Sequence, residues 1–270
     1  MSWRPAAAGA PIPNDPTPMS LHDRVVKKLV RTVKKEAMTR LDVVSRDMEP
    51  AFTRLFADCH RYTMTSTERM YALYKAVEYV VRNRIPGDLV ECGVWKGGSA
   101  MMMALALAHF GDTTRTLYLY DTFAGMPEPG ELDRDERGRE SLATWESRQR
   151  EGYNEWCYSP LDEVKRNLAH TGYPADRVVF VPGKVEDTIP GIQPERTALL
   201  RLDTDWYAST RHELEHLYPR LVPGGVLVLD DYGAWQGARQ AADEYFGGRG
   251  IPLLLNRIDV TGRIAVKCQP

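Results

Sequence analysis

The 270-residue sequence has no marked excess of either charge and no long apolar run. Lys and Arg number 35 against 37 Asp and Glu, which gives a formal net charge of −2. Nucleic-acid-binding proteins need a basic excess to neutralise phosphates, so this balance argues against a nucleic-acid partner. No segment approaches the ~20 consecutive apolar residues that span a bilayer, and the first residues lack a basic region followed by an apolar one. We therefore expect a cytoplasmic protein without a membrane partner.

Cysteine is scarce. Cys59, Cys92, Cys157 and Cys268 are scattered without CxxC spacing. This pattern predicts neither a disulfide framework nor a thiolate zinc site, and it is typical of reduced, mostly buried thiols.

Two N-terminal segments differ from the rest of the chain. Residues 1–20 contain five of the eighteen prolines, a composition that buries too little surface to offset ordering, so we expect a disordered tail. Residues 21–61 are predicted to be a helical extension that begins with a basic amphipathic helix. Such helices can lie on anionic membranes, but this one lacks aromatic anchors, so a docked or oligomerising helix is favoured.

Residues 62–270 alternate between short apolar runs and helix-length segments. The predicted strands are residues 88–93, 116–121, 177–183, 197–203 and 225–231. Strands separated by helices indicate βαβ units, and hence a mostly parallel sheet with helices on both faces. Two further short strands around Thr261 and Gly262 form a terminal β-hairpin. The predicted class is α/β, with a Rossmann-like, seven-stranded, mostly parallel sheet.

One connection is longer than the others. Residues 128–156 are rich in both charge signs and include Trp145, Tyr153 and Trp156. Because the segment is too long for a tight loop, we interpret it as a candidate lid.

The first strand ends in a glycine-rich loop. Ligands of doubly wound sheets bind beyond the carboxyl ends of the strands. Residues 91–99 (ECGVWKGGS) follow the first strand and lead into an apolar helix. Glycines let the backbone approach a ligand, and the helix N-terminus offers unpaired N–H groups. The loop is neither a Walker A nor a GxGxxG motif, and glycines that only form a tight turn are the alternative.

The second strand ends in Asp121, Thr122 and Phe123. A carboxylate here, about 30 residues after the glycine loop, commonly accepts ribose hydroxyls. The loop and the acid together therefore predict a nucleoside-containing ligand. Residues 183–188 follow the third strand, where a polar side chain would meet an adenine; a solvated charge run with a helix cap at Asp187 is the alternative.

Carboxylates follow the next two strands. Asp203 and Asp205 follow the fourth, and Asp230 and Asp231 follow the fifth. Four carboxylates at adjacent strand ends repel one another unless a cation lies among them or some are protonated. Oxygen ligands without nearby Cys or His favour Mg²⁺ or another hard divalent ion over zinc. The alternative is that one or two acids cap helices and the rest face water.

A competing motif lies between these two strands. Residues 212–216 (HELEH) match H-E-x-x-H, in which two histidines one helical turn apart bind zinc. This pattern predicts a zinc hydrolase using His212, Glu213 and His216. No histidine follows His216 to act as a third ligand, so a solvated helix face is the preferred interpretation.

The series of motifs resembles the macrocin O-methyltransferase family, a branch of the class I S-adenosylmethionine-dependent methyltransferases of antibiotic biosynthesis. The resemblance covers residues 62–246 and rests on VECGVWKGGSA, LYDTFAGMPEP, VPGKVEDTIP, LRLDTDWYAST and YPRLVPGGVLVLDDYGAWQGARQA. It implies a methyltransferase domain over residues 62–270, with S-adenosylmethionine and Mg²⁺ as cofactors and a homodimer or higher oligomer assembled partly through N-terminal helices.

The resemblance also implies roles for individual residues. Asp203, Asp230 and Asp231 hold the magnesium ion, and Asp203 is also the general base. A segment at residues 62–66 is similar to one that closes over the cofactor in the family. The implied cofactor-binding residues are Thr63, Met64, Ser66, Glu91, Gly93, Trp95, Gly98, Ser99, Asp121, Thr122, Phe123, Gly183, Val185, Glu186, Asp187 and Asp203.

The acceptor is expected to be a hydroxyl of a secondary metabolite. We favour a deoxysugar of a glycosylated antibiotic, with a phenol or catechol as the alternative. Asp205, Trp206, Tyr232 and Trp235 follow the acids and are candidate substrate contacts, although such aromatics also serve simply to pack. A non-catalytic nucleotide-binding module is a further alternative, against which the intact set of acids argues.

Overall fold

The computed structural model describes residues 47–268. The predicted tail at residues 1–20 and the predicted basic helix at residues 21–44 lie outside these residues. Between residues 47 and 268, no helix is long and apolar enough to cross a membrane.

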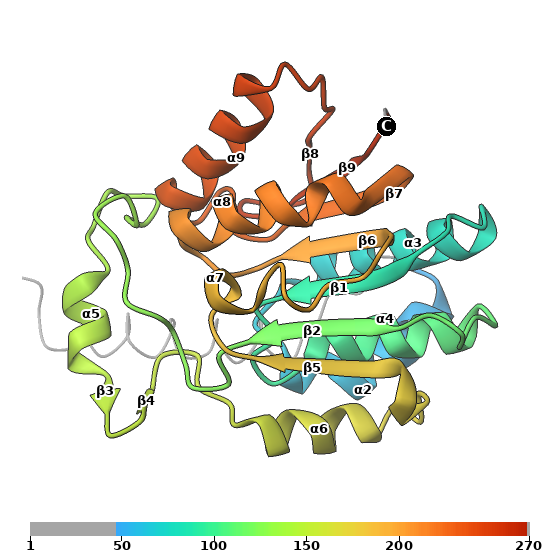
Figure 1. The fold of residues 1–270 in the computed structure, drawn as a ribbon. Helices are drawn as coiled ribbons and strands as arrows, with labels where there is room; N and C mark the ends of the chain where they lie inside the picture. The colour runs from blue at the N-terminus through green and yellow to red at the C-terminus, as the bar shows by residue number, and fades with distance from the viewer. Residues whose placement is uncertain (1–46, 269–270) are drawn as a thin grey trace, which may run out of the picture. The chain divides into compact units, whose positions relative to one another are not determined.

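A seven-stranded sheet in the order β5-β2-β1-β6-β7-β9-β8 forms the centre of the fold (Figure 1). Its strands are β1 (Asp88–Cys92), β2 (Leu117–Asp121), β5 (Val178–Pro182), β6 (Thr197–Leu202), β7 (Leu221–Leu229), β8 (Asn256–Arg257) and β9 (Arg263–Val266). The first five in spatial order are parallel, whereas β9 pairs antiparallel with β7 and β8. The predicted α/β class, strand number and terminal hairpin are confirmed.

Helices cover both faces of this sheet. Helices α2 (Pro50–Cys59), α3 (Thr67–Arg82), α4 (Gly98–His109) and α6 (Leu161–Ala169) pack on one face, and α7 (Val185–Thr188), α8 (Tyr207–His216) and α9 (Gln236–Gly248) on the other. Neighbouring residues of β1 serve opposite cores, since Leu89 joins the first and Val90 the second. Helix α4 is apolar on all sides and is accordingly buried.

The candidate lid has structure of its own. It contains α5 (Leu142–Ser147) and a small antiparallel pair, β3 (Gln149–Arg150) and β4 (Tyr153–Asn154), and it lies beyond the carboxyl ends of the parallel strands (Figure 1). The buried Asp133 accepts a hydrogen bond from the Tyr207 backbone N–H at 2.7 Å. This contact docks the start of the segment on the first turn of α8.

Asp259 ties the loop between β8 and β9 to the start of α3. Its carboxylate accepts hydrogen bonds from the Gly262 N–H (2.7 Å), the Thr261 N–H (2.9 Å) and the Ser66 hydroxyl (2.7 Å). It also pairs with Arg69 Nε at 3.0 Å. Burial alone would raise the pKa of Asp259, but these hydrogen bonds and the Arg69 charge together lower it to about 2.

We expect Asp259→Asn to make the free energy of unfolding depend less on pH under acidic conditions. A carboxylate whose pKa is lower in the folded than in the unfolded protein contributes stability above its ordinary pKa of 3.8, and this contribution is lost as the pH falls toward about 2. Urea denaturation at several pH values in this window should show a steeper rise of unfolding free energy with pH for the wild type. If the unfolding free energies of the wild type and Asp259→Asn change with pH in parallel, the lowered pKa of Asp259 is contradicted. Asp176→Asn, at an exposed carboxylate, is the control.

Candidate functional site

A cavity of about 280 Å³ lies at the carboxyl ends of the parallel strands. The predicted residues that line it are Thr63, Met64, Gly93, Trp95, Ser99, Asp121, Thr122, Gly183, Val185, Glu186, Asp203, Asp205, Asp230 and Asp231. The predicted residues outside its lining are Ser66, Glu91, Gly98, Phe123, Asp187, Trp206, Tyr232 and Trp235. One cavity therefore brings together the glycine loop, the second-strand acid and the acid cluster.

Asp121 organises the loop that follows β1. One of its oxygens accepts backbone hydrogen bonds from Val94 (2.7 Å) and Trp95 (2.9 Å), and the other accepts one from Phe123 (2.7 Å). Burial raises the pKa of Asp121, and these bonds lower it in part. Gly93, at φ +83°, lies so close to β6 that an added Cβ would be 1.9 Å from the Asp203 carbonyl oxygen. The first glycine of the loop thus allows close strand packing.

Arg201, the central residue of the site, was missed in the sequence. Its guanidinium is 1% exposed. Nη1 lies 2.7 Å from a carboxylate oxygen of Glu91 and 2.7 Å from one of Asp203. Nη2 lies 2.7 Å from Asp230 Oδ1 and 3.2 Å from the Thr65 hydroxyl. An arginine within the apolar run TALLRL was the available signal, because a cation in a buried strand needs acidic partners.

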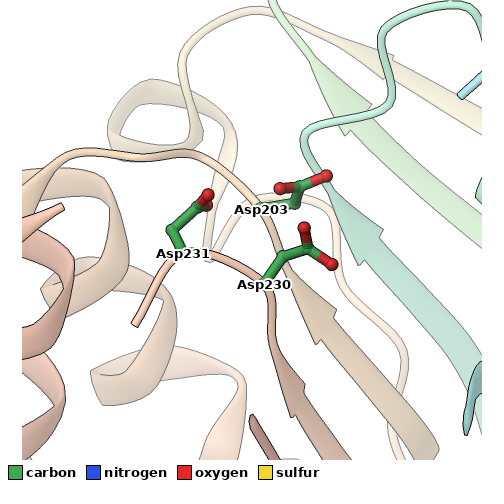
Figure 2. A group of neighbouring side chains, drawn as sticks. All are labelled: Asp203, Asp230 and Asp231. Atoms are coloured by element: carbon green, nitrogen blue, oxygen red, sulfur yellow. The ribbon is translucent and has the colours of Figure 1, made fainter. Parts of the chain in front are cut away.

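The carboxylates of Asp203, Asp230 and Asp231 converge above the ends of β6 and β7 (Figure 2). Each offers an oxygen that lies within 4.8 Å of the others, the one such cluster of three found in the described part of the chain. Burial raises the pKa of both Asp203 and Asp231 well above the usual range, and the neighbouring acids add to this. Burial and the Asp203 charge raise the pKa of Asp205 to about 8.

The cluster contains more carboxyl groups than guanidinium groups. Asp230 is paired on one oxygen with Arg201 and on the other with Arg69. Glu91, Asp203 and Asp230 contact these two guanidinium groups, whereas no ion pair with either is found for Asp205 or Asp231 in the described part of the chain. Oxygen-only donors that outnumber the neighbouring cations fit a hard divalent cation such as Mg²⁺.

The HELEH segment does not assemble a comparable site. His212 Nε2 is 2.9 Å from the Ile189 carbonyl oxygen, and among the described residues no third His, Cys or carboxylate joins the two histidines. The predicted solvated face is wrong for Glu213, which is fully buried and accepts a 2.9 Å hydrogen bond from the Thr204 hydroxyl. Tertiary packing of α8 has overridden the local charge pattern, and the zinc-hydrolase alternative gains no support.

Three of the predicted substrate contacts are engaged elsewhere. Trp206 is 2% exposed, with ring centroids 5.0 Å from Trp235 and 5.7 Å from Trp156. The Tyr232 hydroxyl donates to Asp243 at 2.6 Å. The tryptophans pack on one another outside the cavity lining, as the packing alternative expected, and Asp205 is the member of this set that lines it.

Several predicted cofactor residues have structural tasks. Ser66 caps α3 by accepting the Arg69 N–H at 3.1 Å, and Phe123 packs against Phe180. Asp187 is exposed on α7, whose cap position is taken by Lys184. The lining also includes residues outside the predicted set: Tyr62, Thr65, Arg69, Val94, Tyr120, Gly125, Met126, Pro127, Cys157, Lys184, Thr204, Ser209, Ala234 and Thr261.

A parallel sheet with a glycine loop, an acid after β2 and carboxylates after β6 and β7 is the arrangement of a Rossmann-like methyltransferase. The model of the macrocin-O-methyltransferase (TylF) family matches residues 18–266. The chain belongs to this family and is an O-methyltransferase.

Named relatives agree with this assignment. The chain is 40% identical over 205 residues, 74% of each chain, to the 8-demethyl-8-(2,3-dimethoxy-alpha-L-rhamnosyl)-tetracenomycin-C 4'-O-methyltransferase of Streptomyces olivaceus. It is 36% identical over 203 residues to the mycinamicin III 3''-O-methyltransferase of Micromonospora griseorubida, covering 74% of this chain and 76% of the relative. Its fold is similar to the structure of the O-methyltransferase NovP, with a TM-score of 0.68 and 33% identity over 77% of this chain and 83% of that one.

We expect Arg201→Met to destabilise the fold by about 3–5 kcal/mol, because it leaves buried carboxylates without their cation. Urea denaturation at neutral pH measures this loss. Arg239→Met on the exposed face of α9 is the matched control and should change the free energy of unfolding by less than about 0.5 kcal/mol. A loss for Arg201→Met no larger than that of the control would show that the acids do not depend on this guanidinium.

Proposed function

We propose that this protein transfers the methyl group of S-adenosylmethionine to a hydroxyl of a secondary metabolite, namely a deoxysugar of a glycosylated antibiotic. The single observation that carries the proposal is the cavity whose lining joins the Asp121 loop to the acid cluster. The names of the relatives support a sugar, since one names a rhamnosyl substrate.

In this proposal, the cofactor occupies the side of the cavity formed by β1, β2 and β5. Gly93, Trp95 and Ser99 contact its methionine part, and residues 183–186 lie beside the adenine. Asp121 accepts a ribose hydroxyl. Three backbone N–H groups already use three of the about four acceptor positions of its carboxylate, so one position remains, on Oδ1.

We propose that Asp203, Asp230 and Asp231 hold Mg²⁺. The converging oxygens and the surplus of carboxylates over guanidinium groups support this ion. When bound, the metal supplies charge stabilisation for an acceptor oxygen that is losing its proton.

The protein's own contribution is to position the acceptor and remove its proton. A sulfonium methyl needs no activation, so alignment of an acceptor oxygen with it can contribute about 7–11 kcal/mol. Asp203 is proposed as the base. Arg201 holds Asp203 Oδ2 at 2.7 Å, which fixes the carboxylate and leaves Oδ1 to take the proton.

The function is tested by incubating the purified protein with S-adenosylmethionine, Mg²⁺ and a panel of deoxysugar glycosides and catechols. We expect mass spectrometry to show one added methyl group on a glycoside, abolished by EDTA and restored by Mg²⁺. Methylation of catechols alone would favour the phenol alternative. Binding of S-adenosylhomocysteine without any turnover would favour the non-catalytic module, and zinc-dependent hydrolysis lost in His212→Ala would favour the hydrolase.

We expect Asp203→Asn to lower kcat by at least about 100-fold, because the variant cannot accept the acceptor's proton. The dissociation constant of S-adenosylhomocysteine, measured by calorimetry, should change little, since the proposed cofactor contacts lie mainly on β1 and β2. Asp176→Asn is the control. Near-normal turnover of Asp203→Asn would remove this residue as the base.

The proposed oligomer is a homodimer or higher form. Light scattering on the purified full-length chain measures its mass in solution.

A further inference from the structure

Helix α8 carries a buried acid that the proposed chemistry does not use. The Glu213 side chain is fully buried. One carboxyl oxygen accepts the 2.9 Å hydrogen bond from the Thr204 hydroxyl, and the other has no hydrogen-bond partner among the described residues. A buried carboxyl group with one unpartnered oxygen costs folding free energy, so its hydrogen bond with Thr204 calls for a functional explanation.

No Lys or Arg between residues 47 and 268 forms an ion pair with this acid. The ionisable groups that face Glu213 are Cys92 and Glu186, both acidic. Burial raises the pKa of Glu213 well above its usual range and the nearby Glu186 charge raises it further, whereas the hydrogen bond from Thr204 and the neighbouring Cys92 thiol lower it in part. The hydrogen bond from the Thr204 hydroxyl is therefore the contact that orients the Glu213 side chain.

Thr204 lies between two of the acids of the cavity. It is the middle residue of Asp203-Thr204-Asp205, directly after β6, and it lines the cavity itself. Its carbonyl oxygen accepts hydrogen bonds from the Trp206 N–H at 2.7 Å and the Ser209 hydroxyl at 3.3 Å. Asp205 has φ +65°, a left-handed conformation that is uncommon outside glycine, although Asp adopts it more readily than most residues.

The opposite side of this turn is held by the strand next to β6. The Asp203 N–H donates to the Cys92 carbonyl oxygen at 2.9 Å, and the Asp203 backbone packs directly on Gly93. The Asp205 N–H donates to Asp231 Oδ2 at 3.1 Å. Backbone contacts thus fix both ends of the turn, and the bond to Glu213 fixes the side chain at its centre.

We propose that Glu213 is a positioning residue for methyl transfer: it holds the Thr204 hydroxyl and so keeps the turn at residues 203–206 in the conformation that sets Asp203 among the other acids. This inference rests on the proposed function. It assigns the glutamate of HELEH to the support of the acid cluster, whereas His212 binds the carbonyl of Ile189.

The test is a double-mutant cycle in the full-length protein. Glu213→Leu removes the acceptor, Thr204→Val removes the donor, and Glu213→Gln keeps an acceptor oxygen of the same size. We expect each of the first two to lower kcat by about tenfold to about 100-fold through misplacement of Asp203. The kcat of the double variant should fall no further than that of either single variant, because all three variants lack the same Thr204–Glu213 hydrogen bond.

Two further readouts separate positioning from a loss of stability. Glu213→Gln should retain most of the wild-type kcat, and S-adenosylhomocysteine should bind all variants alike by calorimetry. A Mg²⁺ titration by calorimetry should show weaker binding to Glu213→Leu and near-wild-type binding to Glu213→Gln. Glu215→Gln, at an acid of the same helix paired with Arg211, is the control and should behave as wild type.

The inference is overturned if Glu213→Leu keeps the kcat and Mg²⁺ affinity of the wild type, if the losses in the double variant multiply, or if Glu213→Gln fails as badly as Glu213→Leu. If Glu213→Leu does not fold, the kcat values of Thr204→Val and Glu213→Gln still test the positioning role: the first should fall and the second should stay near that of the wild type. Absence of methyl transfer by the wild type defeats the proposed function instead, and the Mg²⁺ titration then still tests the positioning role.

Discussion

The site depends on the burial of one guanidinium among three carboxylates. Removing charges from water costs several kcal/mol per ion, and only close, well-aligned contacts offset that cost. Arg201 makes such contacts at 2.7 Å with Glu91, Asp203 and Asp230. These acids belong to three strand ends, and the contact with Thr65 adds the segment before α3. A single side chain therefore fixes the relative positions of the parts that bound the cavity.

Arg201 and Arg69 also hold the acids in place before any ligand binds. Both oxygens of Asp230 and one oxygen of Asp203 are engaged by guanidinium groups. Fixed charges in a site of low dielectric need little reorganisation when charge develops during a reaction. Their arrangement explains how several carboxylates coexist at one edge of the sheet, which simple repulsion would otherwise oppose.

Local patterns predicted the fold well because they depend on near neighbours. Buried runs such as TALLRL and the apolar stretch of α4 specify their own secondary structure, and the strand ends then follow from the topology. The contacts that complete the site are of another kind. Arg201 meets Glu91 across 110 residues, and Trp206 donates to Pro127 across 79 residues. No local periodicity encodes such pairs. The position of Trp206 after the acids therefore predicted a contact with the acceptor, whereas tertiary packing puts its side chain outside the cavity lining.

The charge of the cavity bears on the kind of acceptor it suits. Among the described residues that line it, six carboxylates, Asp121, Glu186, Asp203, Asp205, Asp230 and Asp231, stand against two cationic side chains, Arg69 and Lys184. An acceptor that arrives with its own negative charge would add repulsion in a partly buried site where screening is weak. A sugar hydroxyl arrives neutral and becomes anionic only as its proton leaves. The near-zero net charge of the chain thus conceals a local excess of acid, which favours a neutral hydroxyl over an anionic group.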